Sequence, residues 1–281
     1  MARISARRHP PWISLRGVEF VVTYRGASQE RRENLLGTLR YLDRTYSDFT
    51  VWLIEADASP TFSWQQLSDP KIRHVFVHDT GRFSRARLAN LGARMCTSRV
   101  ICFQDIDMIA NPRYMKAAID SLMDTNNSDA VCPFIRVVNT AGELRRSFIE
   151  SGNYDELAPF ASCDEADLPP DMNLLYANTS GALNVFLRSE FIRIGGFDPV
   201  FEGWGGEDDD LLLRATRLGV RWHMLSGTDA LLFHMHHDTA LRADWYNRPE
   251  VEANRKKGFE CGEIPLPQVE SRAAALAKYF K

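Results

Sequence analysis

The first half of the chain alternates short apolar runs with segments in which apolar residues recur every three or four positions. The apolar runs are typical of buried strands and lie at residues 18–24, 50–54, 72–77, 100–103 and 130–135. Helical spacing occurs in the leucines at 35, 36, 39 and 42, in residues 82–96, and after Asn111-Pro112, a cap residue followed by proline. Because strands and helices that alternate form a sheet covered by helices, the pattern predicts an α/β fold with helices on both faces.

The second half departs from this pattern at residues 150–171, which are acidic, contain three prolines and lack clear periodicity. We expect a surface loop or mobile flap there. The alternation resumes at residues 182–187 with a helical segment to Ile194, and the tail from Trp245 onward is charged and expected to be helical in pieces.

Composition narrows the possible classes of protein. The 281 residues carry a net charge of −3, with 44% hydrophobic and 25% charged residues. This charge argues against general nucleic-acid binding, which usually needs a strongly basic face. The sequence predicts no transmembrane segment and no signal peptide, since no apolar run approaches roughly 18 residues. Five widely spaced cysteines favour free thiols in a reducing compartment. We therefore expect a cytoplasmic protein, with peripheral membrane contact by the basic N-terminus left open.

Two carboxylates, Asp105 and Asp107, directly follow the buried run at 100–103. On a strand they would face the same way, and open α/β sheets bind ligands at the ends of such strands. Carboxylate oxygens suit Mg²⁺ or Mn²⁺ bridging a diphosphate. An Asp-x-Asp also occurs by chance as a polar turn, but the helix start at Asn111-Pro112 supplies the strand–site–helix context that favours a ligand site.

Three of the seven histidines, His234, His236 and His237, lie within four positions after the apolar run 230–233. If the strand continues, His234 and His236 share a face and can chelate one cation; if the chain turns helical, His234 and His237 do so. We favour the strand pairing. Imidazole beside carboxylate favours Mn²⁺ over Mg²⁺. The alternative is a surface cluster that holds no ligand.

Residues 203–210 read Gly-Trp-Gly-Gly-Glu-Asp-Asp-Asp and precede a helical segment that ends near Gly219. Acidic residues in a first helical turn interact favourably with the helix dipole, by about 0.3–1 kcal/mol each. That effect explains one or two carboxylates better than four. A carboxylate beside an acceptor hydroxyl can act as general base for displacement at a sugar carbon. With the flat indole of Trp204 beside them, these carboxylates indicate a catalytic site.

Other residues occupy positions where a nucleotide sugar would bind. Arg85 opens the helix before the Asp-x-Asp strand and could grip a diphosphate, although a solvated basic helix face is the alternative. The remaining donor-site candidates follow strands or interrupt them: Tyr24 and Arg25 for the base and phosphate, Glu55 for a uracil N–H, and Gly181 for a donor sugar lying against backbone, or else a strand bulge.

Segments 178–197 and 201–210 resemble the C-terminal signature of the β-1,4-galactosyltransferases and the related segment of bacterial chondroitin-polymerase-type enzymes. Tyr24-Arg25, Phe83-Ser84-Arg85 and Asp105-Ile106-Asp107 stand in the matching order for a GT-A fold glycosyltransferase. The resemblance covers about residues 18–238. It implies a single GT-A catalytic domain, a Rossmann-like mixed sheet with helices on both faces. Thr23-Tyr24 replaces the family's usual Pro-Phe, which leaves the donor open.

The resemblance also implies roles for individual residues. Asp107, His234 and His236 become metal ligands, with His237 as the alternative second histidine. Asp208 takes the place of the catalytic base. The positions assigned to substrates are Asp105, for the nucleotide ribose or the metal, and Trp204, Gly206, Glu207 and Asp209, for the acceptor.

The sequence therefore predicts an inverting glycosyltransferase that uses Mn²⁺, or else Mg²⁺. It would move a hexose or N-acetylhexosamine of galactose type from a UDP-sugar to a saccharide or glycoconjugate hydroxyl. A metal-dependent hydrolase and an inactive sugar-binding protein on a transferase fold are the alternatives. We divide the chain into a basic extension (1–17), a catalytic domain (18–240) and a charged tail (241–281). Within the domain we expect a nucleotide-binding half (18–135), a loop or flap (136–172) and an acceptor and metal half (173–240).

Overall fold

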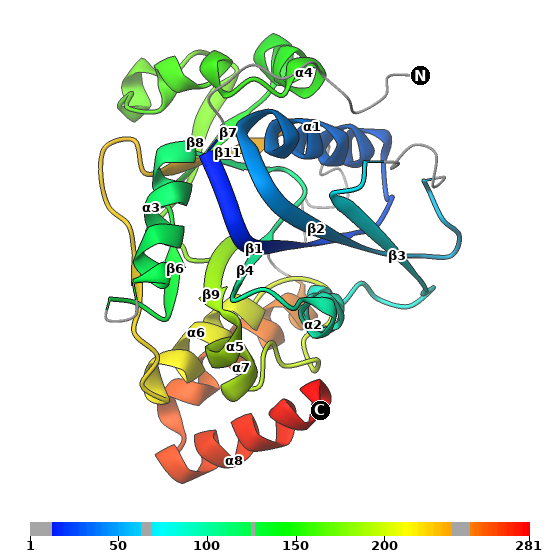
Figure 1. Cartoon of the computed structure of the whole chain (residues 1–281), viewed down its shortest axis with the longest axis vertical. Coiled ribbons are helices and arrows are strands. Elements are labelled where there is room, and N and C mark those ends of the chain that lie inside the picture. The colour runs from blue at the N-terminus through cyan, green and yellow to red at the C-terminus, as the bar shows by residue number, and fades with distance from the viewer. Residues whose placement is uncertain (1–12, 63–68, 125–126, 238–247) are drawn as a thin grey trace.

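The computed structural model describes residues 13–62, 69–124, 127–237 and 248–281, and a seven-stranded mixed sheet forms its centre (Figure 1). Strands β1 to β4 run parallel, whereas β9 is antiparallel to both of its neighbours, β4 and β6. The strands in spatial order are β10 (Trp222–Met224), β6 (Ala130–Cys132), β9 (Leu183–Leu187), β4 (Val100–Gln104), β1 (Ile13–Tyr24), β2 (Tyr46–Asp57) and β3 (Ile72–His78).

Helices cover both faces of this sheet, as the sequence predicts. Successive side chains of a strand point to opposite faces, so Phe20 and Val22 pack into one core and Val21 into the other. The first core is closed by α1 (Gln29–Thr45), α3 (Pro112–Met123) and α4 (Gly142–Ser151), the second by α2 (Arg85–Met95), α5 (Arg188–Arg193) and α6 (Glu207–Arg217). Figure 1 shows α1 and α2 on opposite sides of β1 to β3.

A second sheet of four strands, in the order β5-β11-β7-β8, lies beside the first core. Its strands are β5 (Met108–Ala110), β11 (Leu231–Met235), β7 (Arg136–Thr140) and β8 (Met172–Ala177). β7 and α4 lie within the region expected to be a loop or flap (136–172), and β8 begins at its end; none of these three elements was predicted from the sequence. Between α4 and β8 the chain forms three short 3₁₀ helices, Tyr154–Glu156, Ala158–Phe160 and Glu165–Asp167.

Local signals read from the sequence set several helix ends. Asn111 caps α3 by accepting a hydrogen bond from the Arg113 N–H, with Pro112 at the first helical position, as predicted. Gly219 follows α6 with a φ of +74°, the left-handed conformation expected after a helix end. All five cysteines are free thiols. No helix in the described part of the chain is long and apolar enough to cross a membrane.

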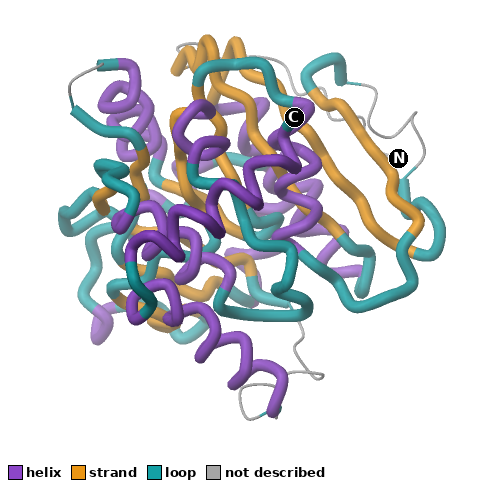
Figure 2. Tube along the Cα trace, turned by 90° about the horizontal axis from the view of Figure 1, so that it is seen from below, coloured by secondary structure: helices purple, strands orange, loops and turns teal. Residues whose placement is uncertain are grey.

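The region expected to be a charged tail contains α7 (Pro249–Glu263), α8 (Leu266–Ala277) and a terminal 3₁₀ helix (Lys278–Phe280). Helix α7 packs along α6, and α8 packs against α5 and α6. Seen from below, the helix that leads to the C-terminus lies in front of the strands (Figure 2). The C-terminal segment is therefore packed on the same face as the acidic helix α6.

Candidate active site

A cavity of about 410 Å³ opens where the carboxyl ends of β1 and β4 meet the second sheet and the start of α6. Ligand sites in open α/β sheets lie at this edge. Most of the residues predicted to do chemistry line this cavity: Arg85, Asp105, Asp107, Gly181, Trp204, Gly206, Glu207, Asp208, Asp209 and His234.

Asp105 and Asp107 lie in the turn between β4 and β5 rather than on a strand. The Met108 N–H donates to the Asp105 carbonyl at 3.4 Å across this turn, and the Asp105 N–H donates to the carbonyl of Ala182, just before β9, at 2.9 Å. Because β4 ends at Gln104, the two carboxylates diverge: Asp105 accepts from Nε of Arg85 at 2.7 Å, whereas Asp107 turns toward the histidines. The expectation that the strand continues through Asp107 is therefore wrong, although both side chains line the same cavity.

Asp107, His234 and His237 form a buried group whose potential ligand atoms all lie within 4.8 Å of one another. Nε2 of His237 is 3.1 Å and Nε2 of His234 is 3.9 Å from Oδ2 of Asp107. Burial alone would raise the pKa of Asp107, but the hydrogen bond with His237 and the charges of His234 and Arg31 outweigh it and hold this pKa well below its usual value. Two imidazoles and one carboxylate fit a divalent cation such as Mn²⁺.

The second histidine of this group is His237 rather than the predicted His236. The predicted pairing required a strand through residue 236, but β11 ends at Met235, whose N–H donates to the Asp107 carbonyl at 2.7 Å. The backbone N–H of His236 donates to the Thr140 carbonyl at 2.9 Å, and its half-buried side chain is not part of the group. The turn after β11 brings His237 to Asp107.

Arg85 lies among three carboxylates that also line the cavity. Its Nε contacts Asp105 at 2.7 Å, and its Nη1 is 3.2 Å from Asp208 and 3.7 Å from Glu207. Burial raises the pKa of Asp208 and of Glu207, and the Arg85 charge only partly opposes this effect. These two carboxyl groups therefore hold protons at higher pH than ordinary acidic side chains do.

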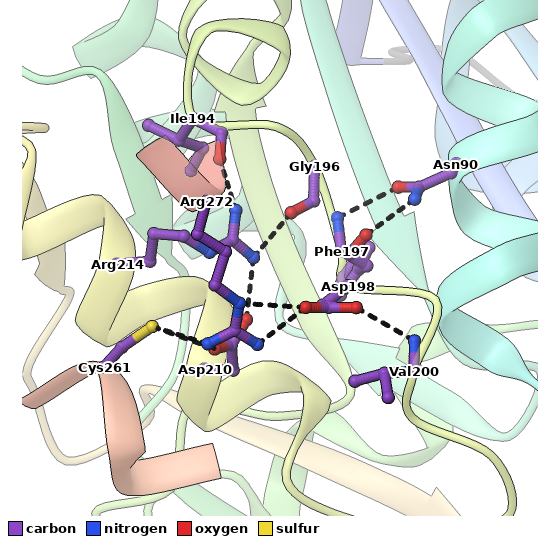
Figure 3. Close-up of polar contacts among 10 residues, drawn as sticks. All are labelled: Asn90, Ile194, Gly196, Phe197, Asp198, Val200, Asp210, Arg214, Cys261 and Arg272. Carbon is purple, nitrogen blue, oxygen red and sulfur yellow. Dashed lines mark hydrogen bonds and ion pairs between the residues drawn. The ribbon is translucent and has the colours of Figure 1, made fainter. Parts of the chain in front are cut away.

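The fourth carboxylate of the run, Asp210, belongs to the protein interior (Figure 3). It is fully buried and pairs with Arg214 at 2.8 Å and with Arg272 of α8 at 3.1 Å. Arg214 also donates to the carbonyls of Ile194 and Gly196. The acidic run therefore divides: Glu207, Asp208 and Asp209 line the cavity, whereas Asp210 holds α6 to the segments packed beneath it.

The predicted acceptor-side residues lie at the start of α6. Trp204 lines the cavity with 37% of its surface exposed. Burial raises the pKa of Asp209, and the charge of Arg255 opposes this. Gly206 has a φ of +86°, and a Cβ there would lie 2.2 Å from the Asn254 carbonyl oxygen, so close packing on α7 requires this glycine. At Gly181 a Cβ would lie 3.0 Å from Oδ2 of Asp208.

Three predicted donor-site residues do not line the cavity. Arg25, which follows β1, donates to the carbonyls of Ala56, Asp79 and Gly81, and so links the end of β1 to the end of β2 and to the loop after β3. Both carboxylate oxygens of Glu55 are engaged, by Thr61 and by His74 at 2.7 Å. Tyr24 is fully buried against Phe62, with its hydroxyl inside the core.

The cavity lining also includes residues that the sequence analysis missed: Arg31 of α1, Tyr176 of β8, and Arg255 and Phe259 of α7. None of them belongs to a short motif. Their approach depends on the packing of elements far apart in the chain, so only the folded structure identifies them.

Two family matches cover most of this chain. Residues 20–176 match Glycosyl transferase family 2, and residues 166–238 match the family described as the N-terminal domain of galactosyltransferase. The first match takes in the Asp-x-Asp turn, and the second takes in the acidic start of α6 and the histidines.

The chain is similar to validoxylamine A glucosyltransferase of Streptomyces hygroscopicus subsp. jinggangensis, at 28% identity over 240 residues. That match covers 76% of this chain and 54% of the relative, so the chain spans about half the length of this relative. Among solved structures, GalNAc-T7 matches with a TM-score of 0.59 at 12% identity, and the match covers 94% of this chain and 55% of the GalNAc-T7 chain. The mannosyltransferase PcManGT of Pyrobaculum calidifontis has a TM-score of 0.50 at 18% identity, covering 95% and 77%.

These neighbours show the fold, which is the predicted GT-A architecture. The family match over more than half of the chain identifies it as a member of Glycosyl transferase family 2.

Proposed function

We propose that this chain is an inverting, metal-dependent glycosyltransferase that moves a galactose-type hexose or N-acetylhexosamine from a UDP-sugar to a hydroxyl of a saccharide or glycoconjugate. One observation carries the proposal: Asp107 and His234, which form a group with His237, line the same cavity as Asp208. The match to a galactosyltransferase domain supports the galactose-type sugar. Related folds contain UDP and Mn²⁺ in GalNAc-T7, and GDP-mannose and Mn²⁺ in PcManGT, which supports a nucleotide-diphosphate sugar and a metal.

In this proposal Asp107, His234 and His237 hold Mn²⁺ or, less favourably, Mg²⁺. Such an ion neutralises the negative charge that develops on a departing diphosphate. Two neutral imidazoles leave more of the cation's charge for the diphosphate than three carboxylates would. Arg31, with Nη1 3.8 Å from Asp107, adds positive charge on the same side of the cavity.

Asp208 accepts the proton of the acceptor hydroxyl as the acceptor oxygen attacks the anomeric carbon. The new carbon–oxygen bond forms on the face opposite the diphosphate, and the bond to the diphosphate oxygen breaks with its electron pair. A single displacement of this kind inverts the anomeric configuration. Arg85 favours the ionised, proton-accepting form of Asp208, while burial keeps the pKa of this carboxyl high enough for useful basicity. Trp204 offers its exposed indole to the acceptor ring.

UDP release from a panel of UDP-sugars, with Mn²⁺ and then with a chelator, tests this function without knowledge of the acceptor. We expect release from one donor that the chelator abolishes and that Asp208→Asn reduces when an acceptor is present. A panel without release, together with no UDP binding by titration, would refute the transferase. A metal-dependent hydrolase would instead act without nucleotide dependence, and an inactive sugar-binding protein would bind UDP and metal without turnover.

A further inference from the structure

Helix α7 reaches the cavity although it lies beyond both family matches. Arg255 and Phe259, four residues apart and hence on one face of this helix, both line the cavity. Phe259 leaves 52% of its surface exposed. The helix thus contributes a cation and an apolar ring beside the acidic start of α6.

The position of α7 is fixed against the loop that carries Trp204. Nδ2 of Asn254 donates to the carbonyls of Glu202, at 2.9 Å, and Trp204, at 3.2 Å. A Cβ on Gly258 would lie 2.7 Å from the Gly206 carbonyl oxygen, so the two backbones are in close contact. Phe259 is therefore held at a set place relative to Trp204.

Apolar rings gather at this cavity. Of the six exposed large hydrophobic side chains in the described part of the protein, three line it: Tyr176 (36% exposed), Trp204 (37%) and Phe259 (52%). A concentration of exposed apolar surface usually marks a binding site. Aromatic faces beside carboxylates suit a saccharide, because its C–H faces pack on the rings while its hydroxyls donate to the carboxylates.

We propose that α7 completes the acceptor subsite. Phe259 packs against a saccharide acceptor beside Trp204, and Arg255 donates hydrogen bonds to the ring or hydroxyl oxygens of that saccharide. The inference rests on the proposed transferase function. It assigns acceptor selection to a helix outside the family motifs, so that members of this family with another C-terminal segment would select other acceptors.

The test compares Phe259→Ala with Tyr279→Ala, which removes another exposed aromatic ring that does not line the cavity. The probes are p-nitrophenyl mono- and disaccharides, with the donor that supports metal-dependent UDP release. We expect at least one glycoside to accelerate UDP release. Phe259→Ala should raise the KM for this glycoside about tenfold and change kcat less, whereas Tyr279→Ala should leave the KM unchanged.

An unchanged KM in Phe259→Ala, or no acceleration by any glycoside, would overturn the assignment of a saccharide to α7. In either case continued release of UDP without acceptor would leave the transferase proposal standing. Absence of UDP release from the wild-type enzyme, together with no UDP binding by titration, would instead refute the transferase itself. Circular dichroism and thermal unfolding show that both variants are folded before kinetics are compared.

A separate observation concerns the far side of His234. Its Nδ1 is 3.0 Å from Oδ1 of Asn139 on β7, and Nδ2 of Asn139 donates to Oδ1 of Asn173 on β8 at 3.2 Å. Because the amide nitrogen of Asn139 is directed to Asn173, its oxygen accepts from Nδ1–H of His234. The imidazole then carries its proton on Nδ1 and presents the Nε2 lone pair toward Asp107.

We infer that Asn139 is a positioning residue that sets the tautomer and ring orientation of His234 for metal binding. A carbonyl or carboxylate acceptor behind a ligating histidine is a common arrangement, and its loss weakens metal affinity by about 10–100-fold. Here the acceptor comes from the second sheet, which the sequence motifs do not reveal. Asn173 in turn holds the Asn139 amide in its orientation.

Mn²⁺ titration of the metal-free protein, followed by electron paramagnetic resonance, tests this role without reference to turnover. We expect Asn139→Leu to weaken Mn²⁺ binding about 10–100-fold and Asn139→Asp, which keeps an acceptor, to bind within a few-fold of wild type. Nitrogen-15 spectra of the imidazoles report the tautomer directly. The inference would be overturned if Asn139→Leu bound Mn²⁺ as tightly as wild type, or if both substitutions weakened binding equally. It would also be overturned if the wild type did not bind Mn²⁺.

Discussion

Replacing Arg85 by methionine would show whether one guanidinium controls the ionisation of the proposed base. The substitution removes the positive charge from among three carboxylates at 2.7, 3.2 and 3.7 Å. It keeps an unbranched apolar side chain, which can still pack over the Phe197 ring, now 5.2 Å from the guanidinium carbon. The change therefore acts mainly on charge.

The size of the effect follows from these distances. An opposite charge within about 4–6 Å lowers the pKa of a carboxyl by about 1–3 units, and each unit corresponds to about 1.4 kcal/mol. Burial already raises the pKa of Asp208 above its ordinary value of 3.8, and Arg85 opposes this rise. Without Arg85 the pKa rises further. Because the base must be ionised, kcat/KM falls as the pH drops through this pKa, so its acid limb moves to higher pH by about 1–3 units.

The measurement is the pH profile of kcat/KM for UDP release in the presence of acceptor. Arg87→Met serves as the control, since Arg87 lies on the same helix but is 46% exposed and pairs with Asp79 instead. We expect its acid limb to coincide with that of wild type. An acid limb that stays in place in a folded Arg85→Met enzyme would refute the link between Arg85 and the proton-accepting carboxylate.

Three further predictions follow from the packing of the site. His237→Ala should weaken Mn²⁺ binding at least about tenfold by calorimetry, whereas His236→Ala should change it little; the reverse order would contradict the ligand set. Asp210→Ala should lower the free energy of unfolding in urea by about 3–5 kcal/mol, because its buried arginine partner loses its counter-charge, and a loss below about 1 kcal/mol would contradict this. Gly258→Ala should lower thermal stability by about 1–3 kcal/mol, since its Cβ would meet the Gly206 backbone; unchanged unfolding would show that α7 can move aside.

The sequence predicted β1, β2, β4, β6 and β9 because these strands are largely buried on both faces and therefore read as apolar runs, whereas the half-buried β10 was not predicted. It did not predict β7, β8 or α4. For β8 the reason is that most of its residues are half-buried or exposed, so that it carries no such run. From the order of the motifs, Asp107, Asp208 and His234 were predicted to belong to one site, and all three line one cavity. The choice between His236 and His237 depended on where β11 ends, which apolar periodicity cannot fix to one residue.

Tyr24, Arg25 and Glu55 show a different limit. Tyr24 and Arg25 lie at the end of β1 as predicted, whereas Glu55 lies within β2 rather than after it. The direction of each side chain depends on partners in neighbouring loops, such as Thr61 and the Gly81 carbonyl. Conversely, Arg255 and Phe259 reach the cavity from a segment whose sequence gave no functional signal. Contacts of this kind arise from tertiary packing rather than from local spacing.

The ion pairs of Figure 3 also bear on how this enzyme can be recombined with its relatives. Arg272 of α8 contacts Asp198, before the glycine-rich loop, and Asp210, just after it, so the two acidic residues bracket the proposed acceptor loop. Exchanging only the last helices between family members would remove Arg272 and leave Asp198 and Asp210 without this partner. A functional graft would have to begin upstream of Asp198 and carry the loop, α6, α7 and α8 together. The segment that must be exchanged as a whole to transfer acceptor selection would then be a block of some eighty residues rather than a short motif.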